Sequence, residues 1–367
     1  MITQEQVMHA LSHVQEPDLG KDLVTLNMIK DVSINNDTKE VGFTVVLTTP
    51  ACPLKDMIRG ACENAIKLLV DKEAVPIVKF TANVSTNRKT GEGALPGVKN
   101  IIAVASGKGG VGKSTVSVNL ALSLAKTGAK VGIMDADIYG PSIPLMLGIR
   151  AERPYMQDVD GKGMIVPIEV MGIKAMSIGL MIDEKQAVVW RGPMASSAIR
   201  QFITDVLWGE LDYLILDMPP GTGDVHLTMA QTIPITGAVI VTTPQEVAMA
   251  DAKKAIMMFD NPQIKVPVLG VVENMAYFSP AELPDNKYFI FGEGGGARLA
   301  DQFELAYLGQ IPIVMSIREG GDKGKPVAMG DDEISKLAFE KVSSEVARVV
   351  ALRNANLPMT KVVEVLV

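Results

Sequence analysis

Residues 107–114 read Gly107-Lys108-Gly109-Gly110-Val111-Gly112-Lys113-Ser114, and no other part of the chain indicates a fold as strongly. The residues before this octapeptide, 101–105, are apolar and predict a buried strand, whereas residues 114–126 predict a helix. A glycine-rich loop with the pattern GxxxxGK, followed by Ser or Thr, between a strand and a helix is typical of a phosphate-binding loop. The sequence therefore predicts a P-loop nucleotide site.

A triphosphate needs many N–H donors that converge on it, and this loop can supply them. Glycines let the backbone approach the phosphates closely and adopt positive φ angles, and the N-terminus of the following helix adds a partial positive charge. We expect Lys113 to reach the β- and γ-phosphates and the Ser114 hydroxyl to bind Mg²⁺. Residues 107–115, with Thr115 at their end, are therefore the predicted site for ATP and Mg²⁺.

After the loop, short apolar runs alternate with helical segments. A helix is predicted at 195–208, and further strands are predicted at 130–134, 213–216, 238–242 and 268–272. Apolar strands that alternate with helices are typical of a parallel sheet buried on both faces. The predicted fold class is therefore α/β, a P-loop NTPase with a mainly parallel sheet covered by helices on both faces.

Residues 1–85 predict a separate small α+β domain in front of this sheet. Helices are expected at 3–14 and 54–70, and strands at 29–34, 41–48 and 77–84. The apolar face expected for the second helix consists of Met57, Ile58, Ala61, Ala65, Leu68 and Leu69. Residues 86–97 are rich in Gly, Pro and charge and predict a linker, which leaves 98–367 as the ATPase domain.

The bulk composition excludes several classes of protein. The net charge of −7 argues against non-specific binding to nucleic acid or to an anionic membrane surface. No apolar run approaches the roughly 18 residues of a membrane span, and the N-terminus does not resemble a signal peptide. The sequence contains two cysteines, Cys52 and Cys62, so no disulfide framework is expected. We therefore expect a cytoplasmic protein without nucleic-acid or stable membrane association.

Carboxylates follow two of the predicted strands. Asp135 and Asp137 come after residues 131–134, and Asp217 comes after residues 213–216. The carboxyl ends of parallel strands form the ligand-binding edge of such a sheet. Asp217 is expected to orient the ligands of Mg²⁺, Asp137 to position the attacking water, and Asp135 to support Mg²⁺ or Lys113. The alternative for Asp135 and Asp137 is a cap of the turn that follows them.

Several longer motifs resemble the Mrp/ApbC branch of the MinD/ParA superfamily of P-loop ATPases. They are residues 108–115 with their early lysine, 135–142 (DADIYGPS), 190–194 (WRGPM), 217–224 (DMPPGTGD), 272–275 (VENM) and 291–296 (FGEGGG). The first domain resembles the small iron–sulfur-assembly domain often fused to these proteins, through residues 16–19 (EPDL) and 47–54 (LTTPACPL). The resemblance covers nearly the whole chain.

This resemblance implies a homodimer that hydrolyses ATP and carries iron–sulfur clusters to apo client proteins, or works with other assembly factors. It implies that Lys108 crosses the dimer interface to the nucleotide of the other subunit; the alternative is a solvated loop lysine. It also implies that Asn274 contacts adenine, whereas the alternative is a turn residue at a strand end. Arg191 and its neighbours are expected to be interface or structural residues.

The cysteines depart from the family pattern. Many Mrp proteins carry a Cys-x-x-Cys pair after the segment that corresponds to residues 274–278, so that two subunits hold one 4Fe–4S cluster, but residues 277–286 here contain no cysteine. Clusters need soft thiolate ligands. Cys52, before Pro53 at an expected helix start, is a candidate ligand, together with Cys62 or with cysteines of a partner. Two other interpretations remain: the protein assists another carrier, or the cluster role has been lost. Cys62 is expected to be buried.

Two functions of other classes compete with the carrier. One is a MinD- or ParA-like switch that cycles on a membrane surface or on DNA, for which residues 358–367 are a poor membrane anchor. The other is an electron donor of the nitrogenase iron-protein kind, which the lack of cysteines in the ATPase domain argues against.

The cysteine content gives a first prediction. Anaerobic reconstitution with iron and sulfide should give less than one cluster per dimer, because the usual four thiolates are missing. Cys52→Ala should abolish whatever binds, as measured by iron and sulfide counts on the wild type and the variant. A full cluster that is independent of Cys52 would show this interpretation to be wrong.

Overall fold

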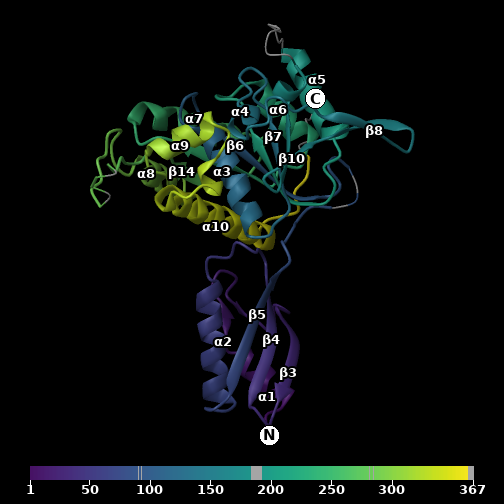
Figure 1. The fold of residues 1–367 in the computed structure, drawn as a ribbon, viewed down its shortest axis with the longest axis vertical. Coiled ribbons are helices and arrows are strands. Elements are labelled where there is room, and N and C mark those ends of the chain that lie inside the picture. The colour runs from purple at the N-terminus through teal and green to yellow at the C-terminus, as the bar shows by residue number, and fades with distance from the viewer. Residues whose placement is uncertain (90, 92, 183–191, 281, 284, 363–367) are drawn as a thin grey trace. The chain divides into compact units, whose positions relative to one another are not determined.

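The structure is a computed structural model, and it describes residues 1–89, 91, 93–182, 192–280, 282–283 and 285–362 (Figure 1). Two compact units can be separated. The smaller is Met1–Ser85 with Ala351–Leu357, and the larger is Thr86–Val350 with the residues from Pro358 onward. Within the described residues, none of the helices combines the length and the apolar character that a membrane crossing requires.

An eight-stranded sheet organises the larger unit, in the order β10-β11-β7-β12-β6-β13-β14-β15. Neighbouring strands are parallel, except that β10 runs antiparallel to β11. The bounds are β6 Val98–Ala105, β7 Val131–Asp135, β10 Ile168–Val170, β11 Ile173–Ser177, β12 Leu211–Asp217, β13 Gly237–Thr242, β14 Val268–Glu273 and β15 Ala306–Gln310. The strand before the phosphate loop, β6, thus lies between β12 and β13.

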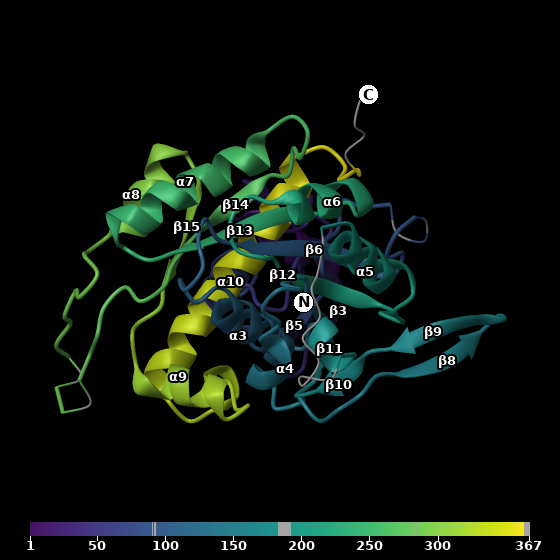
Figure 2. The same ribbon diagram turned by 90° about the horizontal axis from the view of Figure 1, so that it is seen from above.

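Helices cover both faces of this sheet, as Figure 2 shows: α5 to α8 lie on one side, and α3, α4 and α9 lie on the other. The bounds are α3 Lys113–Lys126, α4 Ile143–Met146, α5 Gly192–Thr204, α6 Asp224–Thr232, α7 Glu246–Asp260, α8 Gly295–Gln302, α9 Met315–Asp322 and α10 Glu333–Asn356, with 3₁₀ turns η1 Ile178–Leu180 and η2 Val327–Met329. Central strands such as β7 and β13 are buried along their whole length. The predicted α/β class, with a mainly parallel and doubly covered sheet, is confirmed.

The helix predicted at 195–208 is wrong at its C-terminal end. It stops at Thr204, because residues 205–207 instead run beside the hairpin of β8 (Tyr155–Val159) and β9 (Lys162–Val166). The Ile165 N–H donates to the Asp205 carbonyl at 2.6 Å, and the Leu207 N–H donates to the Ile165 carbonyl at 2.8 Å. A distant strand therefore overrides the local helical pattern here.

The smaller unit is an α+β structure around a three-stranded sheet. Strand β4 pairs antiparallel with β3 and parallel with β5, and Figure 1 shows α2 lying along these strands. The bounds are α1 Gln4–Leu11, β1 Gln15–Glu16, β2 Lys21–Asp22, β3 Ile29–Asn35, β4 Glu40–Leu47, α2 Lys55–Leu69 and β5 Val75–Ala82. Helix α1 begins with a capping box, in which the Thr3 side chain accepts from the Gln6 N–H and the Gln6 side chain accepts from the Thr3 N–H.

The apolar face predicted for α2 is partly wrong. The buried residues are Ile58, Cys62, Ala65 and Ile66. In contrast, Met57 is 58 %, Leu68 82 % and Leu69 53 % exposed. The predicted face included Leu68 and Leu69 and left out Cys62 and Ile66, so it was placed partly around the helix from the narrower face that packs on the sheet.

The segment expected to be a linker is attached to the larger unit at its start. The buried Arg88 side chain donates to the carbonyls of Val98, Ala94 and Leu95, and the Thr86 hydroxyl donates to the Lys99 carbonyl at 2.6 Å. Burial lowers the pKa of Arg88 to about 10, which still leaves the guanidinium charged at neutral pH. These bonds hold Thr86 and Arg88 against the start of β6 and against residues 94–95.

The revised face of α2 gives a prediction about stability. Ile66→Ala should lower the free energy of unfolding by about 3 kcal/mol, because Ile66 is fully buried and its removal leaves a cavity. Leu68→Ala, its exposed neighbour on the same helix, should change it by less than about 0.5 kcal/mol. Urea denaturation of the full chain measures both. Equal costs for the two variants would contradict the observed face.

Candidate functional site

The phosphate loop connects the end of β6 to the start of α3, and two of its glycines are required by geometry. Gly112 has φ 82°, and a Cβ atom there would lie 2.1 Å from the amide nitrogen of Asn274. A Cβ atom on Gly107 would lie 2.1 Å from the carbonyl carbon of Asp251 in α7. Because both positions exclude any side chain, the loop can stay close to the sheet and to α7.

The buried carboxylate of Asp217 is the centre of the site. The Ser114 hydroxyl donates to its Oδ2 at 2.6 Å, and the Ser117 hydroxyl donates to its Oδ1 at 2.7 Å. The Lys113 ammonium lies 2.9 Å from the same Oδ1. Asp217 ends β12, which is the direct neighbour of β6, so the sheet order brings this carboxylate to the first turn of α3. Two hydroxyls and one cation thus satisfy a carboxylate that no water reaches.

Asp137 lies on the other side of the same lysine. The Lys113 ammonium is 3.7 Å from Asp137 Oδ2. Burial raises the pKa of Asp137, the positive charge of Lys113 opposes this shift, and the negative charge of Asp217 adds to it. The lysine therefore bridges two carboxylates that would otherwise repel each other.

Asp135, two residues before Asp137, is fully buried. Its carboxylate accepts from the Ser177 hydroxyl at 2.9 Å and from the N–H groups of Asp137 and Ile143 at 3.1 Å and 3.4 Å. Burial, reinforced by the negative charge of Asp217, raises the pKa of Asp135 well above its usual value. Asp135 thus fastens the turn that carries Asp137, as the capping alternative proposed, while it also lies near enough to Asp217 to interact with it.

Lys108 is half-buried at the tip of the loop. Its carbonyl accepts from the Ser106 hydroxyl at 2.9 Å, which fixes the backbone. In the part of the chain that the structure describes, the Lys108 ammonium forms no ion pair. It therefore differs from Lys113, which lies beside the carboxylates of Asp137 and Asp217.

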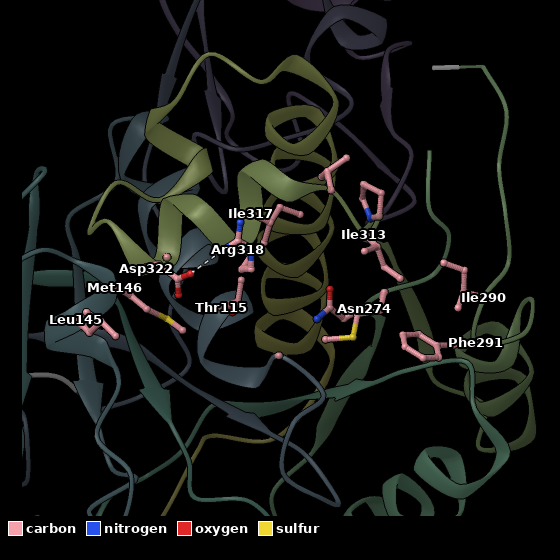
Figure 3. Close-up of a pocket in the computed structure, with 15 residues that line it drawn as sticks. Thr115, Leu145, Met146, Asn274, Ile290, Phe291, Ile313, Ile317, Arg318 and Asp322 are labelled. Carbon is pink, nitrogen blue, oxygen red and sulfur yellow. Dashed lines mark hydrogen bonds and ion pairs between the residues drawn. The ribbon is translucent and has the colours of Figure 1, made fainter. Parts of the chain in front are cut away.

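A cavity of about 560 Å³ opens directly beside the phosphate loop and is mostly apolar (Figure 3). Gly112, Thr115 and Asn274 are among the residues that line it. The Asn274 amide donates to the Val111 carbonyl at 2.8 Å, and its backbone N–H donates to the Thr242 carbonyl at 2.8 Å. Asn274 therefore joins the end of β14 to the phosphate loop and also faces the cavity, so the structure is compatible with both interpretations made from the sequence.

Sequence reasoning missed two residues that contact the central carboxylates. Ser117 follows Ser114 by three positions, so both hydroxyls lie on one face of α3 and reach Asp217. That spacing was a usable signal. Ser177, which contacts Asp135, lies at the end of β11, and no local pattern distinguishes it.

The other motifs have structural roles or lie outside the described residues. In the motif 291–296, the Gly296 N–H donates to the buried carboxylate of Glu273, and burial raises the pKa of Glu273. A Cβ on Gly296 would lie 2.8 Å from the Glu273 Cβ, which explains the glycine. Arg191 and the side chain of Asp224 lie outside the part of the chain that is described.

The two cysteines occupy different environments. Cys62 is fully buried in the core of the smaller unit, as expected, and burial raises its pKa to about 12. Cys52 is half-buried and lies three residues before α2, which begins at Lys55, one residue later than the sequence predicted. Across the described residues, no group of three or more His, Cys, Asp or Glu side chains is arranged to hold a metal ion.

Comparisons with known proteins agree with this geometry. A family described as NUBPL iron-transfer P-loop NTPase matches residues 97–349, and one described as iron-sulfur cluster assembly protein matches residues 4–77. A relative from Synechocystis sp. is 49 % identical over 354 residues, covering 96 % of this chain and 99 % of its own. One from Escherichia coli strain K12 is 45 % identical over 328 residues, covering 89 % and 86 %. Both are named iron-sulfur cluster carrier protein.

A solved structure is similar to the larger unit. It is the nucleotide-binding protein from Archaeoglobus fulgidus in complex with ADP, with 42 % sequence identity and a TM-score of 0.56. The match covers 65 % of this chain and 91 % of that one. The similarity agrees with the α/β fold of the larger unit.

His226, next to the site on α6, gives a prediction about pH. Its ring packs edge-on against Phe259, its Nε2 has no hydrogen-bond partner among the described residues, and burial lowers its pKa to about 4. Because the unfolded chain takes up this proton below about pH 6.5 and the folded one does not, stability is complete above that pH and falls as the pH drops toward 4.

Between pH 7.5 and pH 5.0 this difference should cost the wild type about 2 kcal/mol that His226→Gln does not lose. Urea denaturation at the two pH values measures it, and any packing cost of the variant cancels in the comparison. The exposed His9→Gln is the matched control and should keep the wild-type pH dependence. Identical pH dependences for wild type and His226→Gln would contradict the assignment of a buried neutral histidine.

Proposed function

The chain belongs to the NUBPL iron-transfer P-loop NTPase family, and on that premise we propose that it is an ATP-hydrolysing homodimer that carries iron–sulfur clusters to apo-proteins. The observation that carries the ATPase part is the arrangement of Lys113, Ser114 and Asp217 at the end of β6. The carrier part is supported by the names of relatives at 49 % and 45 % identity.

ATP binding begins with an exchange of partners at Lys113. In the structure its ammonium lies 2.9 Å from Asp217 and 3.7 Å from Asp137. A triphosphate on the loop brings several negative oxygens to the same region, and Lys113 turns from the carboxylates to the β- and γ-phosphates. The loop amides and the N-terminus of α3 bind the rest of the phosphate chain, and the base enters the neighbouring cavity.

The residues present fit Mg²⁺, which prefers hard oxygen ligands. The Ser114 hydroxyl and the Asp217 carboxylate, which lie 2.6 Å apart, would hold the ion. The carboxylate would do so through ordered water. The Asp135 carboxyl lies close enough to Asp217 to interact with it electrostatically. When bound, Mg²⁺ supplies positive charge that neutralises the phosphates. The Ser117 hydroxyl keeps Asp217 in place while Ser114 and Lys113 change partners.

Asp137 is the residue we assign to the attacking water. It is the least buried of the three carboxylates and lies on the ligand side of Lys113. The Asp137 backbone N–H donates to the Asp135 carboxylate at 3.1 Å, which fixes the backbone that carries the Asp137 side chain. A carboxylate held in this way can orient a water toward the γ-phosphate and accept its proton.

Lys108 completes the site of the other subunit in this proposal. The ammonium forms no ion pair in the described part of its own chain, whereas a second nucleotide would offer it a charge partner. A lysine that enters from the partner subunit neutralises charge that develops during phosphoryl transfer. Hydrolysis would then depend on dimer closure, which makes the dimer gated by the nucleotide.

The cluster is cargo and needs thiolates. Cys62 lies in the core of the smaller unit, so Cys52 is the thiolate that each subunit offers. One thiolate per subunit cannot complete the four ligands of a cluster. Cysteines of an assembly factor or of the apo client would therefore supply the others, which suits transfer better than storage.

The role of Lys108 gives the test of this function. Lys108→Ala should lower ATP turnover at least tenfold with unchanged ATP affinity, whereas Lys113→Ala should lose ATP binding. Phosphate release and calorimetry with Mg·ATP measure the two quantities. Lys72→Ala, an exposed lysine of the smaller unit, is the control and should behave as the wild type.

A mixing experiment separates action in trans from action in cis. The Lys108→Ala subunit binds ATP, and a Lys113→Ala subunit can still offer it an intact Lys108. Mixing the two variants should therefore raise turnover above that of either variant alone. Unchanged turnover in Lys108→Ala alone would rule out the role in the dimer.

A further inference from the structure

The cavity beside the phosphate loop has two walls that come from different parts of the chain. Figure 3 shows them on opposite sides, with the α9 residues on one and residues that follow β14 and β15 on the other. The side chains that form the walls are Met146, Ile317 and Arg318 on the first side, and Met275, Phe291 and Ile313 on the second. Five of these six are apolar, and the charged side chains that line the cavity are Arg318 and its ion-pair partner Asp322.

The Arg318 guanidinium is held by its edges. One terminal nitrogen donates to Asp322 Oδ2 at 3.2 Å, and the other donates to Glu319 Oε1 at 3.2 Å. Both carboxylates belong to the same helix, α9, and lie within four positions of the arginine. Hydrogen bonds to a guanidinium lie in its plane, so these bonds leave the two flat faces open. The side chain is 66 % exposed, so a ligand can reach a face.

Two facts argue against a role for Arg318 as a phosphate anchor. Its positive charge is matched by two carboxylates at hydrogen-bond distance, which weakens its attraction for another anion. The phosphate-binding groups already lie on a different element, at residues 107–114. An arginine face beside an apolar slot is instead suited to a flat, uncharged ring, because a guanidinium stacks on aromatic rings.

We propose that Arg318 is the residue that positions the nucleotide base, by stacking its guanidinium face on the purine while Asp322 and Glu319 hold its plane. This inference rests on the proposed ATP site and adds the residue that binds the end of ATP remote from the phosphates. Stacking accepts any purine face, so Arg318 contributes affinity for nucleosides over bare polyphosphates. ATP and ADP share the base, so both gain equally.

Calorimetry with three ligands tests the proposal: Mg·ATP, Mg·ADP and Mg·tripolyphosphate, which has the phosphates without the nucleoside. Arg318→Ala should weaken ATP and ADP binding about tenfold each and leave tripolyphosphate binding unchanged. Arg318→Lys keeps the positive charge but lacks the planar guanidinium. It should therefore weaken ATP binding nearly as much as Arg318→Ala does. In steady-state assays KM for ATP should rise by the same factor while kcat is retained.

Arg298→Ala is the matched control, because Arg298 is 60 % exposed, also pairs with a glutamate and does not line the cavity. Its three affinities should equal those of the wild type. Thermal melting of all variants shows whether they are folded; if Arg318→Ala is not, Arg318→Lys carries the test.

The outcomes are distinct. Equal weakening of ATP and tripolyphosphate in Arg318→Ala overturns the proposal, because it marks a phosphate contact. Wild-type affinity of Arg318→Lys or of Arg318→Ala for ATP overturns it as well. Failure of the wild type itself to bind Mg·ATP would instead refute the proposed function, so the two failures are distinguishable.

Discussion

The buried carboxylate of Asp217 sets the conditions that the rest of the site has to satisfy. An ionised carboxylate without water must be hydrogen-bonded or paired with a cation, because leaving it uncompensated costs several kcal/mol. Ser114, Ser117 and Lys113 supply that compensation from one turn of α3. This explains why α3 has to begin where β6 ends, and why β12 has to lie beside β6 in the sheet.

The sequence could predict part of the fold and of this site. The phosphate loop, the strands on either side of it and the carboxylates at their ends are local patterns, so the fold class and the group Lys113, Asp137 and Asp217 could be located without coordinates. The hairpin 155–166 and the end of α5 at Thr204 depend on pairing between distant segments, and no local pattern contains that information. The exposure of Leu68 depends on the width of the sheet under α2. The walls of the cavity come from four segments that are separate in the sequence, so no local pattern could predict the cavity.

The two cysteines show how burial decides between residues that look equivalent in the sequence. A thiolate ligand must lose its proton and meet the metal, and Cys62 can do neither from the core, where burial raises its pKa to about 12. Cys52 lies three residues before α2 and is half-buried. The described part of the chain thus offers one accessible thiol, at Cys52, and in the proposed carrier that number suits a cluster that passes between proteins more than one that stays.

In the proposed ATP site, the base cavity is lined by two residues with different partners, Asn274 and Arg318. Asn274 donates to the Val111 carbonyl and lies 2.1 Å from where a Gly112 Cβ would be, so its main contacts hold the phosphate loop. An amide that supports the loop has fewer hydrogen-bonding groups left for a base, and its predicted contact with adenine stays a prediction. Arg318 differs from Asn274, because the edges of its guanidinium donate hydrogen bonds to carboxylates of α9 and leave its two flat faces for a base. A base bound between α9 and the residues after β14 would contact both walls, and the second wall is continuous with Asn274. Through the hydrogen bond of Asn274 to the Val111 carbonyl, that wall is joined to the phosphate loop.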